Sequence, residues 1–250
     1  MPLRRFEIHQ PASVQEAVRM LRELGEDGCF YGGGTELLLA MKQDVLRYRH
    51  LVDVKVIPGM GSIEMTGGVI HLGATATHRA IERSDFVRSH LPVFSEMESR
   101  VANVRVRSTG TLGGNLCFGE PHSDPATLLL VLGASIVAEG ASGQREVPMA
   151  EFMTGAYSSS LAREDIMIGI NIPIPSERQR AAYVKFQLHE RPTLGLGMLL
   201  ETPDRGETIT GARVAVACVS PFPRRSAAAE ELLIGSRAEV ERNLSGSADA

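Results

Sequence analysis

The chain has 250 residues, of which 43% are hydrophobic and 22% charged, and this composition is typical of a globular protein with a substantial core. Its formal net charge is -4, with 30 acidic residues against 26 basic ones. Because a nucleic-acid surface needs an excess of basic side chains, this balance argues against nucleic acid as a partner.

The N-terminal part of the chain predicts a helix, a strand, a glycine-rich loop and a second helix. Ser13 and Glu16 have capping-box spacing at the start of an amphipathic pattern, which predicts the first helix. A short strand over 29–31 runs into Gly32-Gly33-Gly34, and Thr35 begins the second helix. Further strands are expected over 50–54, 63–65 and 69–72, and helices over 77–83 and from Pro92 onward.

The stretch 107–126, RSTGTLGGNLCFGEPHSDPA, is rich in turn residues, so we expect polar turns around its Thr-Leu-Gly-Gly-Asn segment. Asp124 followed by Pro125 predicts an N-cap with proline at the first helical position, before a helix over 126–132. Strands are expected over 134–138 and 166–172, the second closed by Pro173 and Pro175 at a domain boundary. Beyond it we expect strands over 182–188, 195–201 and 212–220, a helix over 227–234 and a poorly ordered tail after Gly235.

Two glycine clusters are candidate anion sites, because glycine lets backbone amides approach a phosphate closely. The amides of 32–35 and the Thr35 hydroxyl could hold one phosphate, and 111–115 could offer a second set facing the first. A single glycine pair is more often a tight turn, whereas two clusters suit the two phosphates of a dinucleotide. Neither cluster fits the Rossmann or P-loop pattern, which argues against a nicotinamide site and a P-loop.

No catalytic acid–base pair or activated nucleophile is identified, so any chemistry is expected to be a cofactor's. Asp124 is either a helix N-cap or an acceptor for a ribose hydroxyl. Cys29, Cys117 and Cys218 are dispersed, so neither a metal site nor a disulfide framework is predicted. The longest apolar run, 127–138, is too short to span a membrane, and a soluble cytoplasmic protein is expected.

A resemblance to a known family emerges when the motifs are taken as an ordered set. They are GGGTELLLAMK, HLVDV, LGATATHRAIERSDF, RSTGTLGGNLCFGEPHSDPATLLLVLGA and a strand ending INIP. Together they resemble the FAD-binding medium subunit of the molybdenum hydroxylase family, of the carbon monoxide dehydrogenase and xanthine dehydrogenase type. The resemblance runs to about Pro173, and the remainder is similar to the family's C-terminal flavoprotein domain.

The resemblance implies an α+β fold: a two-subdomain FAD-binding domain of the vanillyl-alcohol oxidase (PCMH) type, then a C-terminal α/β domain with an antiparallel sheet. The implied boundaries are 1–176 for the FAD-binding domain, with subdomains of about 1–56 and 57–176, and 177–250 for the C-terminal domain. Whether the C-terminal domain is complete stays open.

The resemblance also implies roles for particular residues. The first FAD loop matches Gly32, Gly33, Gly34, Thr35 and Glu36, and the second matches Thr111, Leu112, Gly113, Gly114 and Asn115. Both loops are expected to wrap the pyrophosphate. Asp124 matches an aspartate near the ribose and adenine, Met167 an apolar flavin contact and Lys185 a lysine at the flavin.

In such an assembly this chain carries FAD, while molybdopterin and two [2Fe-2S] clusters reside in partner subunits. The implied partners are a molybdenum large subunit and an iron–sulfur small subunit, assembled as a heterohexamer, a dimer of heterotrimers. Electrons would pass from the clusters through FAD to a terminal acceptor. The alternatives are a stand-alone FAD-dependent reductase or oxidase of the same fold and a flavin-free scaffold.

Overall fold

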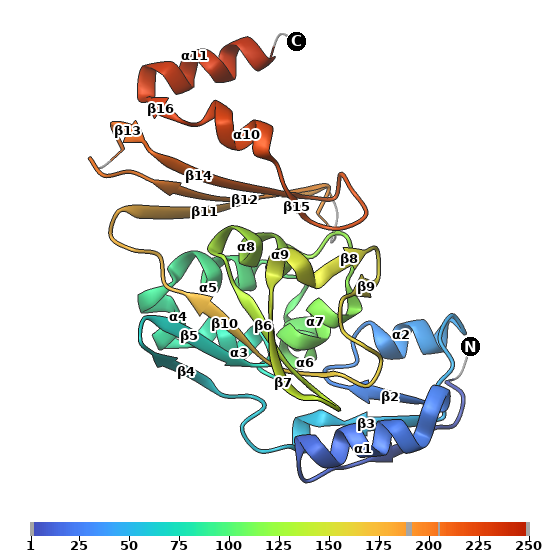
Figure 1. The fold of residues 1–250 in the computed structure, drawn as a ribbon. Coiled ribbons are helices and arrows are strands. Elements are labelled where there is room, and N and C mark those ends of the chain that lie inside the picture. Colours follow the sequence, from blue (N-terminus) through green and yellow to red (C-terminus); the bar gives the residue numbers. More distant parts are fainter. Residues whose placement is uncertain (1–2, 189–191, 205, 249–250) are drawn as a thin grey trace.

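The computed structural model describes residues 3–188, 192–204 and 206–248, and three β-sheets organise them (Figure 1). The first sheet is parallel, with strand order β1 (Glu7–His9), β3 (His50–Asp53) and β2 (Gly28–Tyr31). Helix α1 (Val14–Leu24) covers one face of it, and the predicted cap at Ser13 is confirmed by a hydrogen bond from the Glu16 amide to the serine hydroxyl. The Glu16 carboxylate accepts from the Ala12 amide and not from that of Ser13, so the capping box is only half formed.

The second sheet has five antiparallel strands in the order β4-β5-β10-β6-β7. Their bounds are β4 (Ile63–Thr66), β5 (Val69–Gly73), β10 (Ile166–Pro173), β6 (Ser135–Gly140) and β7 (Gly143–Pro148). Helix α8 (Asp124–Leu132) packs against β10 and is buried along its whole length. Since its residues are apolar nearly all round, this helix has to lie in the core.

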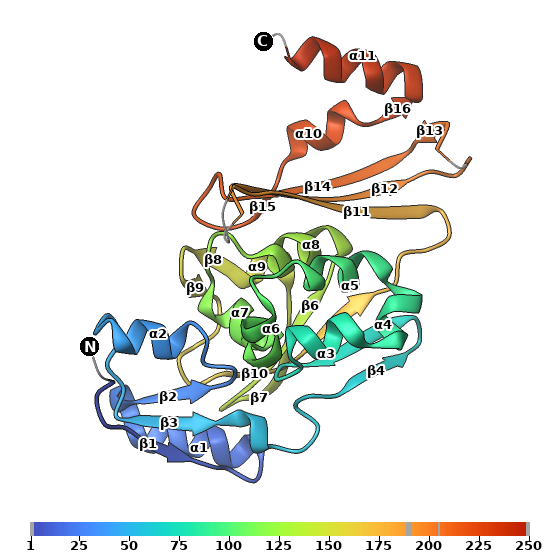
Figure 2. The ribbon, with the colours of Figure 1, turned by 180° about the vertical axis from the view of Figure 1, so that it is seen from behind.

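A group of short helices packs beside the second sheet (Figure 2). They are α3 (His78–Arg83), α4 (Asp85–His90), α5 (Pro92–Ser99), α6 (Val104–Thr109) and α7 (Leu112–Phe118). Side chains cap four of them: Thr77, Ser84, Asn103 and Thr111 each accept a hydrogen bond from a first-turn amide. These caps fix where each short helix begins.

The third sheet is antiparallel, with strand order β11 (Gln179–Phe186), β12 (Leu194–Glu201), β14 (Gly211–Ala217) and β15 (Arg224–Arg225). Helix α8 packs on its inner face, while α10 (Ala227–Leu232) and α11 (Arg237–Ala248) lie on its outer side (Figures 1 and 2). The remaining elements are α2 (Leu37–Lys42), α9 (Met149–Phe152), β8 (Met153–Gly155), β9 (Ser158–Ser159), β13 (Thr208–Ile209) and β16 (Gly235–Ser236).

Three local predictions are wrong. The segment after Arg107 folds into α6 and α7 and not into two turns, because Asn103 and Thr111 cap helices there. The N-cap of α8 is Ser123, whose hydroxyl accepts from the Ala126 amide, so Asp124 lies inside the first turn.

The third wrong prediction concerns the C-terminal tail, which forms α11 over Arg237–Ala248. The Glu239 carboxylate accepts a hydrogen bond from the Ser236 amide, which is one half of a capping box, and a second from the Ser236 hydroxyl, and Val240 is buried. The second predicted helix also begins later than Thr35, since α2 starts at Leu37 with Glu36 as its N-cap. The other predicted strands and helices are confirmed within a few residues of their expected ends.

No helix in the described part of the chain combines the length and apolar character needed to cross a bilayer.

Candidate functional site

Two adjoining hollows lie between the first sheet and the helices α6 and α7. Their volumes are about 300 and 420 Å³, which is in the usual range for ligand sites. Cys29, Phe30, Gly32, Thr111 and Gly114 line both of them, so the hollows share a wall. This region is the candidate site.

Most of the residues that the sequence predicted for the site meet here. The lining includes Gly32, Gly33, Gly34, Thr35, Glu36, Thr111, Gly113, Gly114, Asn115 and Met167. The lining does not include Leu112, whose side chain is fully buried in the core, or Asp124 and Lys185. The two glycine segments, 32–36 and 111–115, are therefore close in space although they are far apart in the sequence.

The first glycine segment follows directly after β2 and crosses to α2. Gly34 has a φ of +71°, a left-handed conformation that glycine adopts without strain. Lys55 holds the start of the segment, because its ammonium donates to the Gly32 carbonyl at 2.9 Å and to Asp53 at 2.7 Å. The same ammonium lies 3.7 Å from the centre of the Tyr31 ring, a cation–π contact.

The two segments touch at Gly33. A Cβ atom on Gly33 would lie 2.4 Å from the Thr109 carbonyl oxygen and 2.6 Å from the Gly110 Cα, closer than any real Cβ contact. One on Gly32 would lie 3.0 Å from the Thr111 hydroxyl oxygen. Only glycine at position 33 allows this approach of the two backbones, because every other side chain begins with that atom.

Backbone amides of the first segment are available to a ligand. Within the described residues, the amides of Gly33, Gly34 and Thr35 have no hydrogen-bond acceptor, although Gly33 is buried. Buried amides without a partner are rare in folded proteins. An anion with several oxygen atoms would satisfy them, as the sequence predicted for this segment.

The second segment differs from the prediction, because four of its five amides, those of 112–115, already have acceptors. Its residues form the cap and first turn of α7, where the Gly114 amide donates to the Thr111 hydroxyl and the Asn115 amide to the Thr111 carbonyl. The amides of Leu112 and Gly113 donate to carbonyls of 76 and 74. Of the expected second set of amides, that of Thr111 alone has no acceptor among the described residues.

Side chains of the second segment still offer polar groups at the hollow. The Thr111 hydroxyl accepts from Gly114 and keeps its own proton to donate. The Asn115 side-chain oxygen accepts from the Ser123 hydroxyl at 2.6 Å, and its Nδ2 has no acceptor in the part of the chain that the structure describes. The donors around the shared wall, three amides, a hydroxyl and an amide side chain, suit a pyrophosphate group.

Asp124 and Lys185 meet each other outside the hollows. The Lys185 ammonium donates to the Asp124 carboxylate at 2.7 Å and to the Arg100 carbonyl at 2.9 Å, and both side chains are at most 5% exposed. The Tyr183 hydroxyl donates to the same carboxylate at 2.5 Å. Burial, and secondly the Asp124 charge, raise the pKa of Tyr183 well above its usual range, so it stays a donor.

Several lining residues carried no signal in the sequence. Cys29, Tyr48, His78 and Tyr157 come from four separate segments, so no local spacing marks them. His78 is 2% exposed and its Nδ1 lies 2.6 Å from the Glu98 carboxylate. For His78 the sequence predicted only its place in a helix over 77–83, which is confirmed as α3.

Comparison with protein families matches residues 4–175 to the FAD binding domain in molybdopterin dehydrogenase. The chain belongs to this family. The predicted resemblance and fold class are thereby confirmed.

Individual relatives agree with this assignment. The carbon monoxide dehydrogenase medium chain of Hydrogenophaga pseudoflava is 31% identical, covering 98% of this chain and 85% of the relative. The xanthine dehydrogenase FAD-binding subunit of Escherichia coli O157:H7 is 26% identical, covering 89% and 77%. A solved structure of the Hydrogenophaga carbon monoxide dehydrogenase, lacking the Mo-pyranopterin moiety, superposes with a TM-score of 0.92 at 32% identity, covering 97% and 86%.

Replacing Gly33 with alanine tests the contact between the two segments. We expect Gly33→Ala to lower the free energy of unfolding by about 1–3 kcal/mol, because the added methyl group overpacks the contact, and to abolish FAD retention. The measurements are denaturant unfolding and the flavin absorbance per protein after reconstitution. Gly61→Ala is the matched control, since its Cβ would meet only the Thr75 hydroxyl oxygen at 3.5 Å. Unchanged flavin content in Gly33→Ala would contradict the account.

Alkaline pH tests the environment of Cys29 in the cavity wall. Burial raises the pKa of Cys29 from 9.0 to about 11. The folded chain therefore keeps a proton that the unfolded chain releases, and this stabilisation is complete below about pH 9 and lost as the pH rises to 11. We expect the free energy of unfolding of the parent to fall between pH 9 and 11. In Cys29→Ala this fall should be smaller by roughly 2–3 kcal/mol.

Cys117 lines the same hollows but is exposed, so the prediction concerns Cys29 alone. A parent and a Cys29→Ala variant with parallel profiles between pH 9 and 11 would show that the Cys29 thiol is not buried as described.

Proposed function

We propose that this chain is the FAD-carrying electron-transfer subunit of a molybdenum-containing hydroxylase or dehydrogenase. Electrons from [2Fe-2S] clusters of a partner subunit would leave through FAD to a terminal acceptor. The observation that carries the proposal is the set of three unpartnered amides at 33–35, held against the backbone of 109–111 beside a cavity. Family membership supports FAD as the ligand.

Each wall residue has a defined task in this proposal. The amides of Gly33, Gly34 and Thr35 would bind the pyrophosphate, helped by the Thr111 hydroxyl and the Asn115 side chain. Gly32 and Gly114 would leave space around the Thr111 hydroxyl, which a Cβ on either residue would crowd. Gly113 lets α7 pack on the backbone of residue 74, and Leu112 would anchor the wall from the core. Glu36 is proposed to border the nucleotide at the start of α2.

Met167 is proposed as an apolar contact of the flavin, because it lines the hollow of about 300 Å³. Asp124, expected near the ribose and adenine, and Lys185, expected at the flavin, are proposed to contact FAD while they form a buried ion pair in which each compensates the other's charge. FAD supplies the redox chemistry when bound. The chain's own residues bind and orient it, and neither acid–base catalysis nor a nucleophile is assigned to them.

The assembly is part of the proposal. We infer an iron–sulfur small subunit and a molybdenum large subunit as partners, in a cytoplasmic heterohexamer built as a dimer of heterotrimers. The relatives support this, because they are named as a medium chain and as an FAD-binding subunit. We also propose a division of the chain into an FAD-binding domain over 1–176, with subdomains of about 1–56 and 57–176, and a C-terminal flavoprotein domain over 177–250.

Isolating the chain from its native host tests the function. We expect about one FAD per chain, together with two further polypeptides, molybdenum and iron in the same fraction. The measurements are visible absorption, metal analysis and mass spectrometry of the co-purifying chains. Substrate turnover by the isolated chain alone would instead favour a self-sufficient reductase or oxidase, and a colourless chain after reconstitution with FAD would favour a scaffold.

A further inference from the structure

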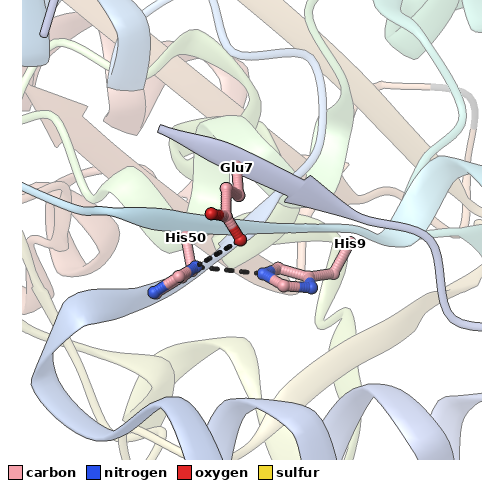
Figure 3. Close-up of side chains that lie close together, drawn as sticks. All are labelled: Glu7, His9 and His50. Carbon is pink, nitrogen blue, oxygen red and sulfur yellow. Dashed lines mark hydrogen bonds and ion pairs between the residues drawn. The ribbon is translucent and has the colours of Figure 1, made fainter. Parts of the chain in front are cut away.

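Two histidines and a glutamate converge on the first sheet, away from the cavity. Glu7 and His9 lie on β1 and His50 begins β3, and their side chains point toward one another (Figure 3). The parallel register pairs Glu7 with His50 and His9 with Val52, so all three side chains lie on the same face of the sheet. Val52 on that face packs with α1 in the core.

The donor atoms have the spacing of ligands that share one ion. Nε2 of His9 lies 3.1 Å from Nδ1 of His50, which lies 3.6 Å from a carboxylate oxygen of Glu7. All three atoms are within 4.8 Å of one another. Two ligands of a tetrahedral zinc ion at its usual bond lengths are about 3.3 Å apart, so small movements would bring these atoms into a common shell.

The mobility of the three side chains suits such a movement. The two histidines are half-buried and held by their strands. The Glu7 side chain is 75% exposed and free to rotate toward the imidazoles. Closing the shell therefore requires a rotamer change of one exposed side chain and no change of backbone.

We propose that Glu7, His9 and His50 bind a divalent transition-metal cation of the zinc type. Two imidazole nitrogens and a carboxylate oxygen are ligands that zinc accepts, and three protein ligands leave a fourth position for water. The ion would link β1 to β3 and so fix the first strand of the chain to the centre of its sheet. His50 begins β3 and pairs with Gly28 at the start of β2, whereas the glycine segment follows the other end of β2. The metal site is therefore separate from the proposed FAD site.

The two imidazoles would use different nitrogens, which gives the site a specific signature. His9 would bind through Nε2 and His50 through Nδ1, because these are the atoms that face each other. Ring-nitrogen NMR shifts distinguish the two modes, and a merely structural histidine pair would show no metal-dependent change at either atom.

Zinc titration of the full chain, without an added histidine tag, tests the proposal. We expect one zinc ion per chain by calorimetry, with affinity reduced about a hundredfold or more in His9→Ala and in His50→Ala, and about tenfold in Glu7→Gln. Zinc should also raise the melting temperature of the parent but not of the histidine variants. Shifts at Nε2 of His9 and Nδ1 of His50 complete the expected result.

His90→Ala is the control, because His90 is an exposed histidine bonded only within its own helix region. This variant should bind zinc as the parent does. Zinc binding that is absent in the parent, or undiminished in His9→Ala and His50→Ala, would overturn the proposal. Both outcomes are independent of FAD, so they leave the proposed function untouched.

Discussion

The candidate site depends on one close contact, between Gly33 and the backbone that links α6 to α7. Gly33 follows the end of β2, and it meets Thr109 and Gly110 where α6 ends and the chain leads to α7. A side chain on residue 33 would not fit between these two backbones. The contact turns the first glycine segment so that three of its amides face away from the protein's own acceptors. In the proposed function, these amides would bind the anion without a cationic side chain.

The third sheet, which begins at Gln179, is joined to this frame through a buried polar network. Lys185 and Tyr183 of β11 both donate to Asp124 at the start of α8, and the lysine also reaches the Arg100 carbonyl. A buried pair of this kind costs desolvation, so its value lies in the specific position that it gives to the third sheet and not in net stability. It holds that sheet against the helix that follows the candidate site.

Sequence patterns were sufficient to predict those elements that depend on interactions between residues close together in the sequence. The helix cap at Ser13, the strand before Gly32 and the hairpin around 67–68 follow from spacing and turn chemistry alone. The segment 111–115 was misread, because two glycines and an asparagine have low helix propensity, while contacts with the carbonyls of 74 and 76 and with Ser123 stabilise a helix there. Propensity was outweighed by tertiary contacts.

Pairs of residues distant in sequence were beyond prediction for a different reason. His9 and His50 are 41 residues apart and Asp124 and Lys185 61 apart, and each pair is created by strand register or by packing of the third sheet on α8. The resemblance to a family located Asp124 and Lys185 individually, but only the structure shows that they bind each other.

The central claim is that the unpartnered amides at 33–35 bind the pyrophosphate of FAD, and amide NMR tests it most directly. Titrating the 15N-labelled chain with FAD should produce the largest shifts at the amides of Gly33, Gly34 and Thr35, with smaller ones at Gly113 and Gly114, whose amides already have acceptors. FAD binding that leaves the resonances of Gly33, Gly34 and Thr35 unchanged would contradict the account.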